Sequence, residues 1–265
     1  MSTKSAVSQG DLDKDIERSR YDNRAAAMMM SISSEQEIPH RAFGAEAIPL
    51  PLREPYIEYE ARVQRWADSS CSILELCAGS GLHSKKLLET GARVVATDIS
   101  QNSLEFLKKS LGRYNGRLVT QTADMEALPF GDATFDMVVC AGGLSYGDND
   151  IVLSEIVRVL KSNGKFICVD SLNNNPIYRL NRWLAYKMGK RSKSTLLRMP
   201  ALETINKYKN SFNKVEVAFF GSLTWMAPLL TRVVGERRTA LLIRWFDQWI
   251  GVKGSAFKFV MTAYK

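Results

Sequence analysis

Residues 73–88 constrain the fold more than any other part of this 265-residue chain. They read I-L-E-L-C-A-G-S-G-L-H-S-K-K-L-L, which predicts a short apolar strand, a turn with two glycines and a helix facing back onto a sheet. Glycine suits position 79 because the backbone must turn sharply there. It suits position 81 because a ligand or a neighbouring backbone comes too close for a Cβ atom. This pattern is typical of the opening of a nucleotide-binding βαβ unit.

The residues after the turn narrow the kind of nucleotide. A dinucleotide fingerprint G-x-G-x-x-G would place a third glycine at position 84, where this chain has Ser84, so nicotinamide and flavin cofactors are disfavoured. A second buried strand is expected at 92–97, and Asp98 at its end follows Gly81 by 17 residues. An acidic side chain at that place can accept hydrogen bonds from both hydroxyls of a ribose.

Four motifs together give the chain a family resemblance. They are Glu75, Cys77, Gly79 and Gly81; Asp98; Ala123 with Asp124; and Phe135-Asp136 leading into Val138, Val139 and Cys140. With them the chain resembles a class I S-adenosylmethionine-dependent methyltransferase. The resemblance implies S-adenosyl-L-methionine as cofactor, S-adenosyl-L-homocysteine as product, and these cofactor-binding residues: Tyr21, Glu75, Cys77, Ala78, Gly79, Gly81, Asp98, Ile99, Asp124, Met125, Ala141, Gly142 and Gly143.

The resemblance also implies roles. Asp98 would fix the ribose, Asp124 and Met125 the adenine, and Glu75 the loop and the cofactor's ammonium group. Tyr21 would lie over the ligand in an N-terminal segment that folds across the site. Plainer interpretations remain open: Tyr21 as a packing residue, Glu75 paired with a neighbouring base, and the glycines after residue 140 as a simple loop.

Alternating strands and helices predict the fold class. Strands are expected at 73–77, 92–97, 117–122, 135–140, 165–169, 213–220 and 257–264, and helices at 11–30, 53–67, 103–112 and 150–160. We therefore expect an α/β, Rossmann-like, doubly wound seven-stranded sheet, mostly parallel with an antiparallel last strand. Residues 1–70 would form a helical segment covering the cofactor site. Residues 71–265 would form the methyltransferase domain, with helical acceptor-binding insertions at 171–212 and 221–255.

The composition limits the size of the core, the cellular location and the role of the cysteines. With 45% hydrophobic residues the chain can bury one sizeable core. The N-terminus lacks signal-peptide features, and no apolar run reaches the roughly 18 residues of a membrane span, so a cytoplasmic and possibly membrane-peripheral protein is expected. The four cysteines show no metal-binding spacing, which favours reduced thiols, and no metal site is expected.

Charge points to the acceptor side. Residues 1–150 carry 16 Lys and Arg against 22 Asp and Glu, a net charge of −6, whereas residues 151–265 carry 20 against 6, a net charge of +14. The C-terminal part should therefore face an anionic acceptor, a membrane or nucleic acid. Residues 170–182 start where open α/β sheets place their ligands. Their acceptor candidates are Asn173, Asn174, Tyr178, Arg179 and Arg182.

This segment is similar to that of bacterial methyltransferases of surface-polysaccharide, other glycan and small-metabolite pathways. Some of those carry His where this chain has Asn174, so no catalytic base is assigned. His83 is expected to be structural, and His40 has no assigned role. We expect in-line O-methylation of a polar, possibly anionic small molecule or glycan. Two alternatives stay open: a nucleic-acid methyltransferase, disfavoured because no RNA-binding module or N/D-P-P-Y/F motif is present, and a membrane-surface enzyme acting on a lipid-linked acceptor.

Overall fold

A seven-stranded sheet forms the centre of the computed structural model, which describes residues 9–30, 42–189, 191–250 and 253–265. The strand order is β3-β2-β1-β4-β5-β7-β6. The bounds are β1 Ser72–Leu76, β2 Arg93–Asp98, β3 Leu118–Thr122, β4 Phe135–Ala141, β5 Leu160–Ser171, β6 Lys214–Phe220 and β7 Lys258–Tyr264. Only β7 pairs antiparallel with its neighbours β5 and β6. The predicted fold class, with its antiparallel last strand, is confirmed.

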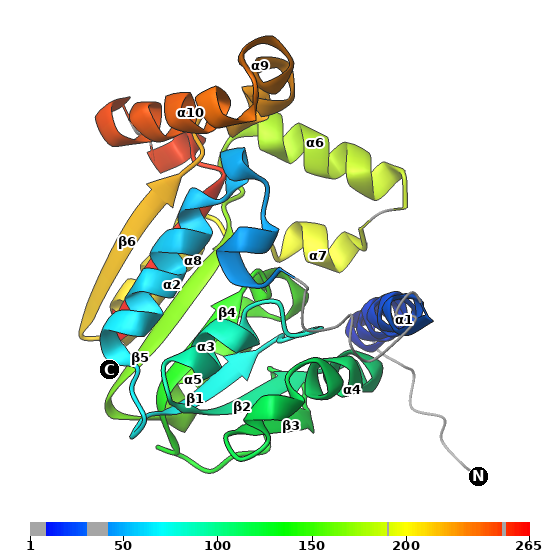
Figure 1. Ribbon diagram of the computed structural model, residues 1–265, viewed down its shortest axis with the longest axis vertical. Coiled ribbons are helices and arrows are strands. Elements are labelled where there is room, and N and C mark those ends of the chain that lie inside the picture. Colours follow the sequence, from blue (N-terminus) through cyan, green and yellow to red (C-terminus); the bar gives the residue numbers. More distant parts are fainter. Residues whose placement is uncertain (1–8, 31–41, 190, 251–252) are drawn as a thin grey trace.

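Helices cover both faces of this sheet (Figure 1). One face carries α2 (Glu54–Trp66), α3 (Ser84–Glu89) and α4 (Gln101–Ser110), and the other carries α5 (Asn149–Val159) and α8 (Leu202–Ser211). Successive residues of β1 serve opposite faces: Ile73 packs with the first group of helices, whereas Leu74 and Leu76 pack with the second. All three are fully buried, which explains why the strand is an unbroken apolar run.

The remaining helices lie beyond the sheet. Helix α1 (Gln9–Met30) lies beside α4, close to the carboxyl ends of the strands (Figure 1). Helices α6 (Pro176–Lys187), α7 (Lys193–Leu197) and α8 follow β5, and α9 (Ala227–Val234) and α10 (Glu236–Ile250) follow β6. We call α6, α9 and α10, which gather at one end of the molecule in Figure 1, the helical cap. None of the helices in the described residues has the length and apolar character needed to cross a membrane.

Two predicted boundaries were wrong. Helix α1 begins at Gln9, before the predicted cap Asp11, and the predicted break at 31–34 lies outside the described residues. Strand β5 begins at Leu160, so the predicted polar turn at 161–164 is an irregular part of the strand where the register with β4 shifts. It is held by the last residue of the chain, because Asn163 N donates to Lys265 O and Lys265 N donates to Gly164 O. That long-range pairing leaves no local signal in the sequence.

Candidate cofactor and acceptor sites

The turn after β1 uses its two glycines differently. Gly79 has φ +51° with open space where a Cβ would lie, and its amide donates to Asp98 Oδ2 at 2.9 Å. Gly81 has φ +80°, and a Cβ there would lie 2.7 Å from Leu107 Cγ on α4. The close neighbour predicted at position 81 is therefore a buried side chain, and neither a ligand nor a backbone segment.

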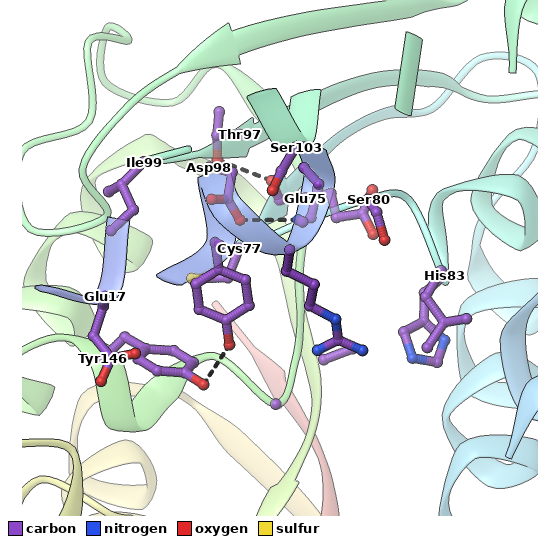
Figure 2. A pocket seen from close by; sticks show the side chains of 18 of the residues that line it. Glu17, Glu75, Cys77, Ser80, His83, Thr97, Asp98, Ile99, Ser103 and Tyr146 are labelled. Carbon is purple, nitrogen blue, oxygen red and sulfur yellow. Dashed lines mark hydrogen bonds between the residues drawn. The ribbon is translucent and has the colours of Figure 1, made fainter. Parts of the chain in front are cut away.

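A cavity of about 650 Å³ opens at the carboxyl ends of β1 to β4. Most of the predicted cofactor-binding residues line it together: Tyr21, Glu75, Cys77, Ala78, Gly79, Asp98, Ile99, Asp124, Met125, Ala141 and Gly142. Figure 2 shows Glu75, Cys77 and Asp98 close to one another within it. The two aspartates that were expected to converge on one ligand thus share one cavity.

Gly81 and Gly143 are not among the residues that line this cavity, and their assignment as cofactor-binding residues stays a prediction. At Gly143 a Cβ would lie 2.7 Å from Cys77 Cβ and 2.8 Å from its Sγ. Cys77 itself has φ 54°, a conformation that is uncommon for a residue with a side chain. Gly143 therefore gives room to the strained end of β1 and acts on the cavity wall only through Cys77.

Two backbone amides hold the buried Asp98 in place, one on each carboxylate oxygen. Its Oδ2 accepts from Gly79 N and its Oδ1 from Ser100 N, each at 2.9 Å. Burial raises the pKa of this carboxyl, against the lowering effect of those two amides. Each carboxylate oxygen can accept a second hydrogen bond. The geometry therefore leaves Asp98 able to accept from a pair of ligand hydroxyls.

Glu75 lies in the wall of the cavity with a hydroxyl partner. Ser84 Oγ donates to its Oε2 at 2.6 Å, and no cation pairs with it among the described residues. Burial raises the pKa of Glu75 to about 8, an effect that the Ser84 hydrogen bond reduces. The suggested pairing with a neighbouring base was wrong. Ser84, which stands where the dinucleotide fingerprint has its third glycine, is thus the hydrogen-bond partner of the buried Glu75.

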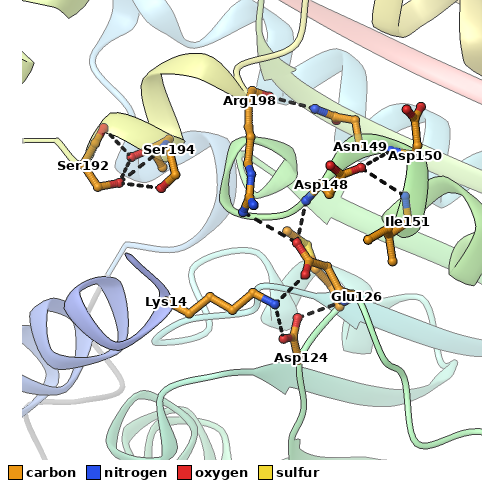
Figure 3. Close-up of polar contacts among 12 residues, drawn as sticks. Lys14, Asp124, Glu126, Asp148, Asn149, Asp150, Ile151, Ser192, Ser194 and Arg198 are labelled. Atoms are coloured by element: carbon orange, nitrogen blue, oxygen red, sulfur yellow. Dashed lines mark hydrogen bonds and ion pairs between the residues drawn. The ribbon is translucent and has the colours of Figure 1, made fainter. Parts of the chain in front are cut away.

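Asp124 belongs to a network that ties α1 to the sheet (Figure 3). Lys14 Nζ lies 2.6 Å from Asp124 Oδ2 and 2.5 Å from Glu126 Oε2. Glu126 also accepts from the amide of Asp148, at the start of α5, and lies 3.6 Å from Arg198. Four segments of the chain therefore meet beside the place predicted for the adenine ring.

Tyr21 reaches the cavity from α1, as predicted, and meets a second tyrosine there. Its hydroxyl lies 2.5 Å from that of Tyr146, and the two rings meet edge to face (Figure 2). Burial raises the pKa of both phenols, so both remain neutral. Tyr146 was not predicted; its place in the glycine-rich segment after β4 was the signal available.

The two histidines differ in what can be said of them. His83 lines the cavity, stacks on Tyr56 with ring centroids 5.3 Å apart and meets Tyr59 edge-on. Burial lowers its pKa to about 4, with Lys258 contributing, so the ring is neutral near pH 7. These contacts agree with the structural role expected for His83. His40 lies outside the described residues.

A second cavity, of about 710 Å³, lies under the helical cap. Of the five acceptor candidates, Tyr178 and Arg182 line it, whereas Asn173, Asn174 and Arg179 do not. Asn173 Oδ1 accepts from Arg182, and Asn174 Oδ1 accepts from Leu202 N at the start of α8. Both amides therefore hold the fold, and Arg179 is exposed on α6.

One short segment lines both cavities. Ala47 and Ile48 line the first and Pro49 lines the second, and consecutive Cα atoms are only about 3.8 Å apart. The buried Lys258 lies between them. Its Nζ is 5.1 Å from the ring centre of Tyr56, which lines the first cavity, and 5.6 Å from that of Phe257, which lines the second.

Lys14, Ser84 and Lys258 were missed by sequence reasoning. Each is one of many similar residues along the chain, and two of them have distant partners: Lys14 is 110 positions from Asp124, and Lys258 lies beside Tyr56. Ser84 alone carried a signal, because it replaces a glycine beside a buried acid. The positions of α1 and β7 in the fold, rather than a local sequence pattern, place Lys14 and Lys258 beside the cavities.

Three features define a class I methyltransferase: a glycine turn after β1, an acid at the end of β2 bonded to that turn, and a sheet whose last strand is antiparallel. The comparisons with known proteins agree. A family model described as a methyltransferase domain matches residues 73–164. Demethylmenaquinone methyltransferase of Thermobifida fusca (strain YX) is 32% identical over 165 residues, which cover 62% of this chain and 67% of the relative.

The same-named protein of Clavibacter sepedonicus is 38% identical over 113 residues, covering 40% of this chain and 44% of that one. This chain thus spans two thirds of one relative and less than half of the next. A solved structure titled as geranyl diphosphate methyltransferase with GPP and sinefungin shares the fold, with TM-score 0.61, 12% identity and coverage of 95% and 98%. The chain belongs to the class I S-adenosylmethionine-dependent methyltransferases.

Proposed function

We propose that this protein methylates an oxygen of a polar or anionic small molecule or glycan, with the first cavity as its S-adenosylmethionine site. The observation that carries the proposal is the shared lining of that cavity by Gly79, Asp98 and Asp124. Its volume lies within the roughly 300–1,000 Å³ of ordinary small-molecule sites.

The lining suits the charges of this cofactor. The carboxylates of Glu17, Asp98 and Asp124 line the cavity against the cations Lys14 and Arg24, and Glu75, whose pKa burial raises to about 8, can ionise when a cation binds beside it. An acidic lining favours a ligand that carries an ammonium and a sulfonium. When bound, the cofactor supplies a methyl group already activated by positive sulfur.

The residues of the chain then have positioning roles. Asp98 would hold the ribose hydroxyls, Asp124 and Met125 the adenine edge, and Glu75 the ammonium group. Tyr21 and Lys14, both from α1, would close the site from outside, since both already contact residues of the opposite wall. Alignment and exclusion of water can supply much of the rate enhancement of such a transfer, because proximity and orientation are worth about 7–11 kcal/mol.

The nucleic-acid alternative loses support. The basic residues between 179 and 198 do not form one exposed surface, because Arg182 is 6% exposed and Arg198 lies 3.6 Å from Glu126. Phosphate-backbone binding needs cations that reach solvent. The acceptor named in the titles of the two bacterial relatives, demethylmenaquinone, instead draws attention to lipid-soluble acceptors.

A lipid-linked acceptor is a second candidate because the helical cap exposes apolar stripes. On α10, Leu241, Trp245 and Trp249 recur at every fourth position and are 65%, 54% and 74% exposed. On α6, Leu180, Leu184 and Met188 follow the same spacing, each more than two fifths exposed. Exposed aromatic and aliphatic side chains beside Arg and Lys suit the surface of an anionic bilayer.

Transfer of tritiated methyl groups from S-adenosylmethionine into cell extracts tests the proposed function. We expect label in a nuclease-resistant fraction with the wild type and none with Asp98→Asn. Nuclease-sensitive label would contradict the proposal, and label that partitions into organic solvent would favour the lipid-linked acceptor.

Flotation with vesicles of phosphatidylglycerol tests the second candidate. The double variant Trp245→Gln, Trp249→Gln should lose flotation. Trp66→Gln, an exposed tryptophan at the end of α2 away from the helical cap, should keep it. Equal flotation of all three proteins would remove the cap as a membrane surface.

A further inference from the structure

Arg182 is a buried cation with no carboxylate partner in the part of the chain that the structure describes. It is 6% exposed, and its Nη1 donates to Leu172 O at 2.7 Å and to Asn173 Oδ1 at 3.0 Å. Its Nη2 is buried and has no hydrogen-bond partner. A buried charge left with only neutral partners is costly to the fold, so it is usually paired with an anion.

Asp170 does not supply that anion. It acts on Arg182 electrostatically, but among the described residues no ion pair or hydrogen bond joins the two side chains, and its oxygens are held by Leu144 N and Ser171 N. Burial, together with the nearby Arg191, lowers the pKa of Arg182 to about 10. Two arginines therefore repel each other in the second cavity, which both of them line.

Arg232 and Glu236 also line the second cavity, and the rest of its lining is largely apolar. The guanidinium carbon of Arg182 lies 5.8 Å from the ring centre of Tyr178 and 5.7 Å from that of Phe257. Trp225, Ala227 and Pro228 continue this lining toward α9. Tyr178 is fixed in place, because its hydroxyl donates to Gly221 O and accepts from Trp225 N. A prearranged apolar wall thus faces a pair of cations.

We propose that the second cavity binds the methyl acceptor as an amphipathic anion, with its phosphate or carboxylate on Arg182 and Arg191 and its apolar part against Tyr178, Trp225 and Phe257. This inference rests on the proposed function, because it gives the acceptor of that reaction a site next to the cofactor cavity.

The test uses decyl phosphate at concentrations where it is monomeric, titrated calorimetrically into the full-length protein saturated with S-adenosylhomocysteine. Decanol has the chain without the charge, and inorganic phosphate has the charge without the chain. We expect decyl phosphate to bind and each of the other two to bind at least about tenfold more weakly, because each lacks one half of the interaction.

Two variants probe the site and one is a control. Arg182→Met should weaken decyl phosphate binding about tenfold or more, since a charged hydrogen bond is lost. Ala185→Trp, on the same helix and in the cavity lining, should block binding without touching the bonds of Arg182. Lys187→Met removes an exposed cation of α6 outside the lining and should leave binding unchanged.

S-adenosylhomocysteine affinity, measured on the same samples, separates the two proposals. If it binds and decyl phosphate does not, the same titrations with phosphatidylcholine vesicles, with and without phosphatidic acid, ask whether the anion must be membrane-borne. If decyl phosphate and phosphatidic acid vesicles each bind the wild type, Arg182→Met and Ala185→Trp equally, the acceptor subsite is refuted. The methyltransferase assignment is then unaffected. Failure of S-adenosylhomocysteine itself to bind would overturn the proposed function.

Discussion

The backbone amide of Gly79, in the turn after β1, donates a 2.9 Å hydrogen bond to the carboxylate of Asp98, the last residue of β2. Strands β1 and β2 are parallel neighbours, so their carboxyl ends arrive side by side. The hydrogen bond fixes the turn and orients the acid in one step. A change at either residue should therefore affect ligand affinity and loop geometry together.

Asp98→Asn should reduce S-adenosylhomocysteine affinity about a hundredfold or more. Two charge-assisted hydrogen bonds to hydroxyls, each worth about 1.5–3 kcal/mol, would be weakened. Calorimetric titration measures the loss, and Asp68→Asn on the surface is the control. Unchanged affinity in a folded Asp98→Asn protein would refute the assigned role.

Gly79→Ala and Gly81→Ala should separate binding from stability. At Gly81 the added methyl meets the buried Leu107 in a left-handed backbone, so the free energy of unfolding should fall by about 2–4 kcal/mol. At Gly79 only the backbone cost of about 1–2 kcal/mol applies. The methyl there would stand in the cavity lining, so ligand affinity should fall instead. Urea unfolding and calorimetry measure the two effects, and the reverse pattern would contradict these assignments.

Lys14→Met should loosen α1. Its ion pairs with Asp124 and Glu126 are partly buried, so their loss should weaken S-adenosylhomocysteine binding about fivefold, equivalent to about 1 kcal/mol. Amide hydrogen exchange in residues 9–30 should become faster. Arg18→Met, which removes an exposed pair with Asp15 on the same helix, should change neither quantity. If both variants behave alike, α1 does not depend on this network.

Glu75 should make stability fall as pH rises. Because burial raises its pKa from 4.5 to about 8, the folded protein keeps a proton there that the unfolded chain releases. The free energy of unfolding then falls with pH between about 4.5 and 8, by up to about 1.4 kcal/mol per pH unit from this group. Denaturant titrations across this range should show a weaker decline for Glu75→Gln.

Ser84→Ala provides the opposite change for the same group. It removes the hydrogen bond that lowers the pKa of Glu75, so the decline should extend to higher pH. Identical pH profiles for wild type, Glu75→Gln and Ser84→Ala would show that Glu75 ionises normally in the folded protein.

Local patterns were sufficient to predict the seven strands, apart from the start of β5, and to bring most of the cofactor motifs to one cavity. An apolar run, two glycines and an acid at the next strand end are close in sequence, and parallel pairing of β1 with β2 brings them together without further information. The motif residues at 124, 125, 141 and 142 reach the same cavity for the same reason.

Partners distant in sequence could not be predicted this way. The pairing of Lys14 with Asp124 depends on where α1 docks, and the burial of Arg182 depends on the packing of α6 under α9. The five acceptor candidates were grouped because they are neighbours in the chain. On α6, Tyr178 and Arg182 are four positions apart and share the face that lines the cavity, whereas Arg179, one position after Tyr178, is exposed on another face.

Helix α1 contacts both halves of the molecule. Lys14 pairs with Asp124 on the cofactor side, and Thr195 of α7 donates to Glu17 at 3.4 Å on the side that leads to the helical cap. A ligand in one cavity that holds α1 in place should therefore also hold the side of α1 that faces the other cavity. A ligand bound in either cavity should then raise the affinity of the other cavity for its ligand by the same factor. The complex with both substrates bound is favoured over either complex with one.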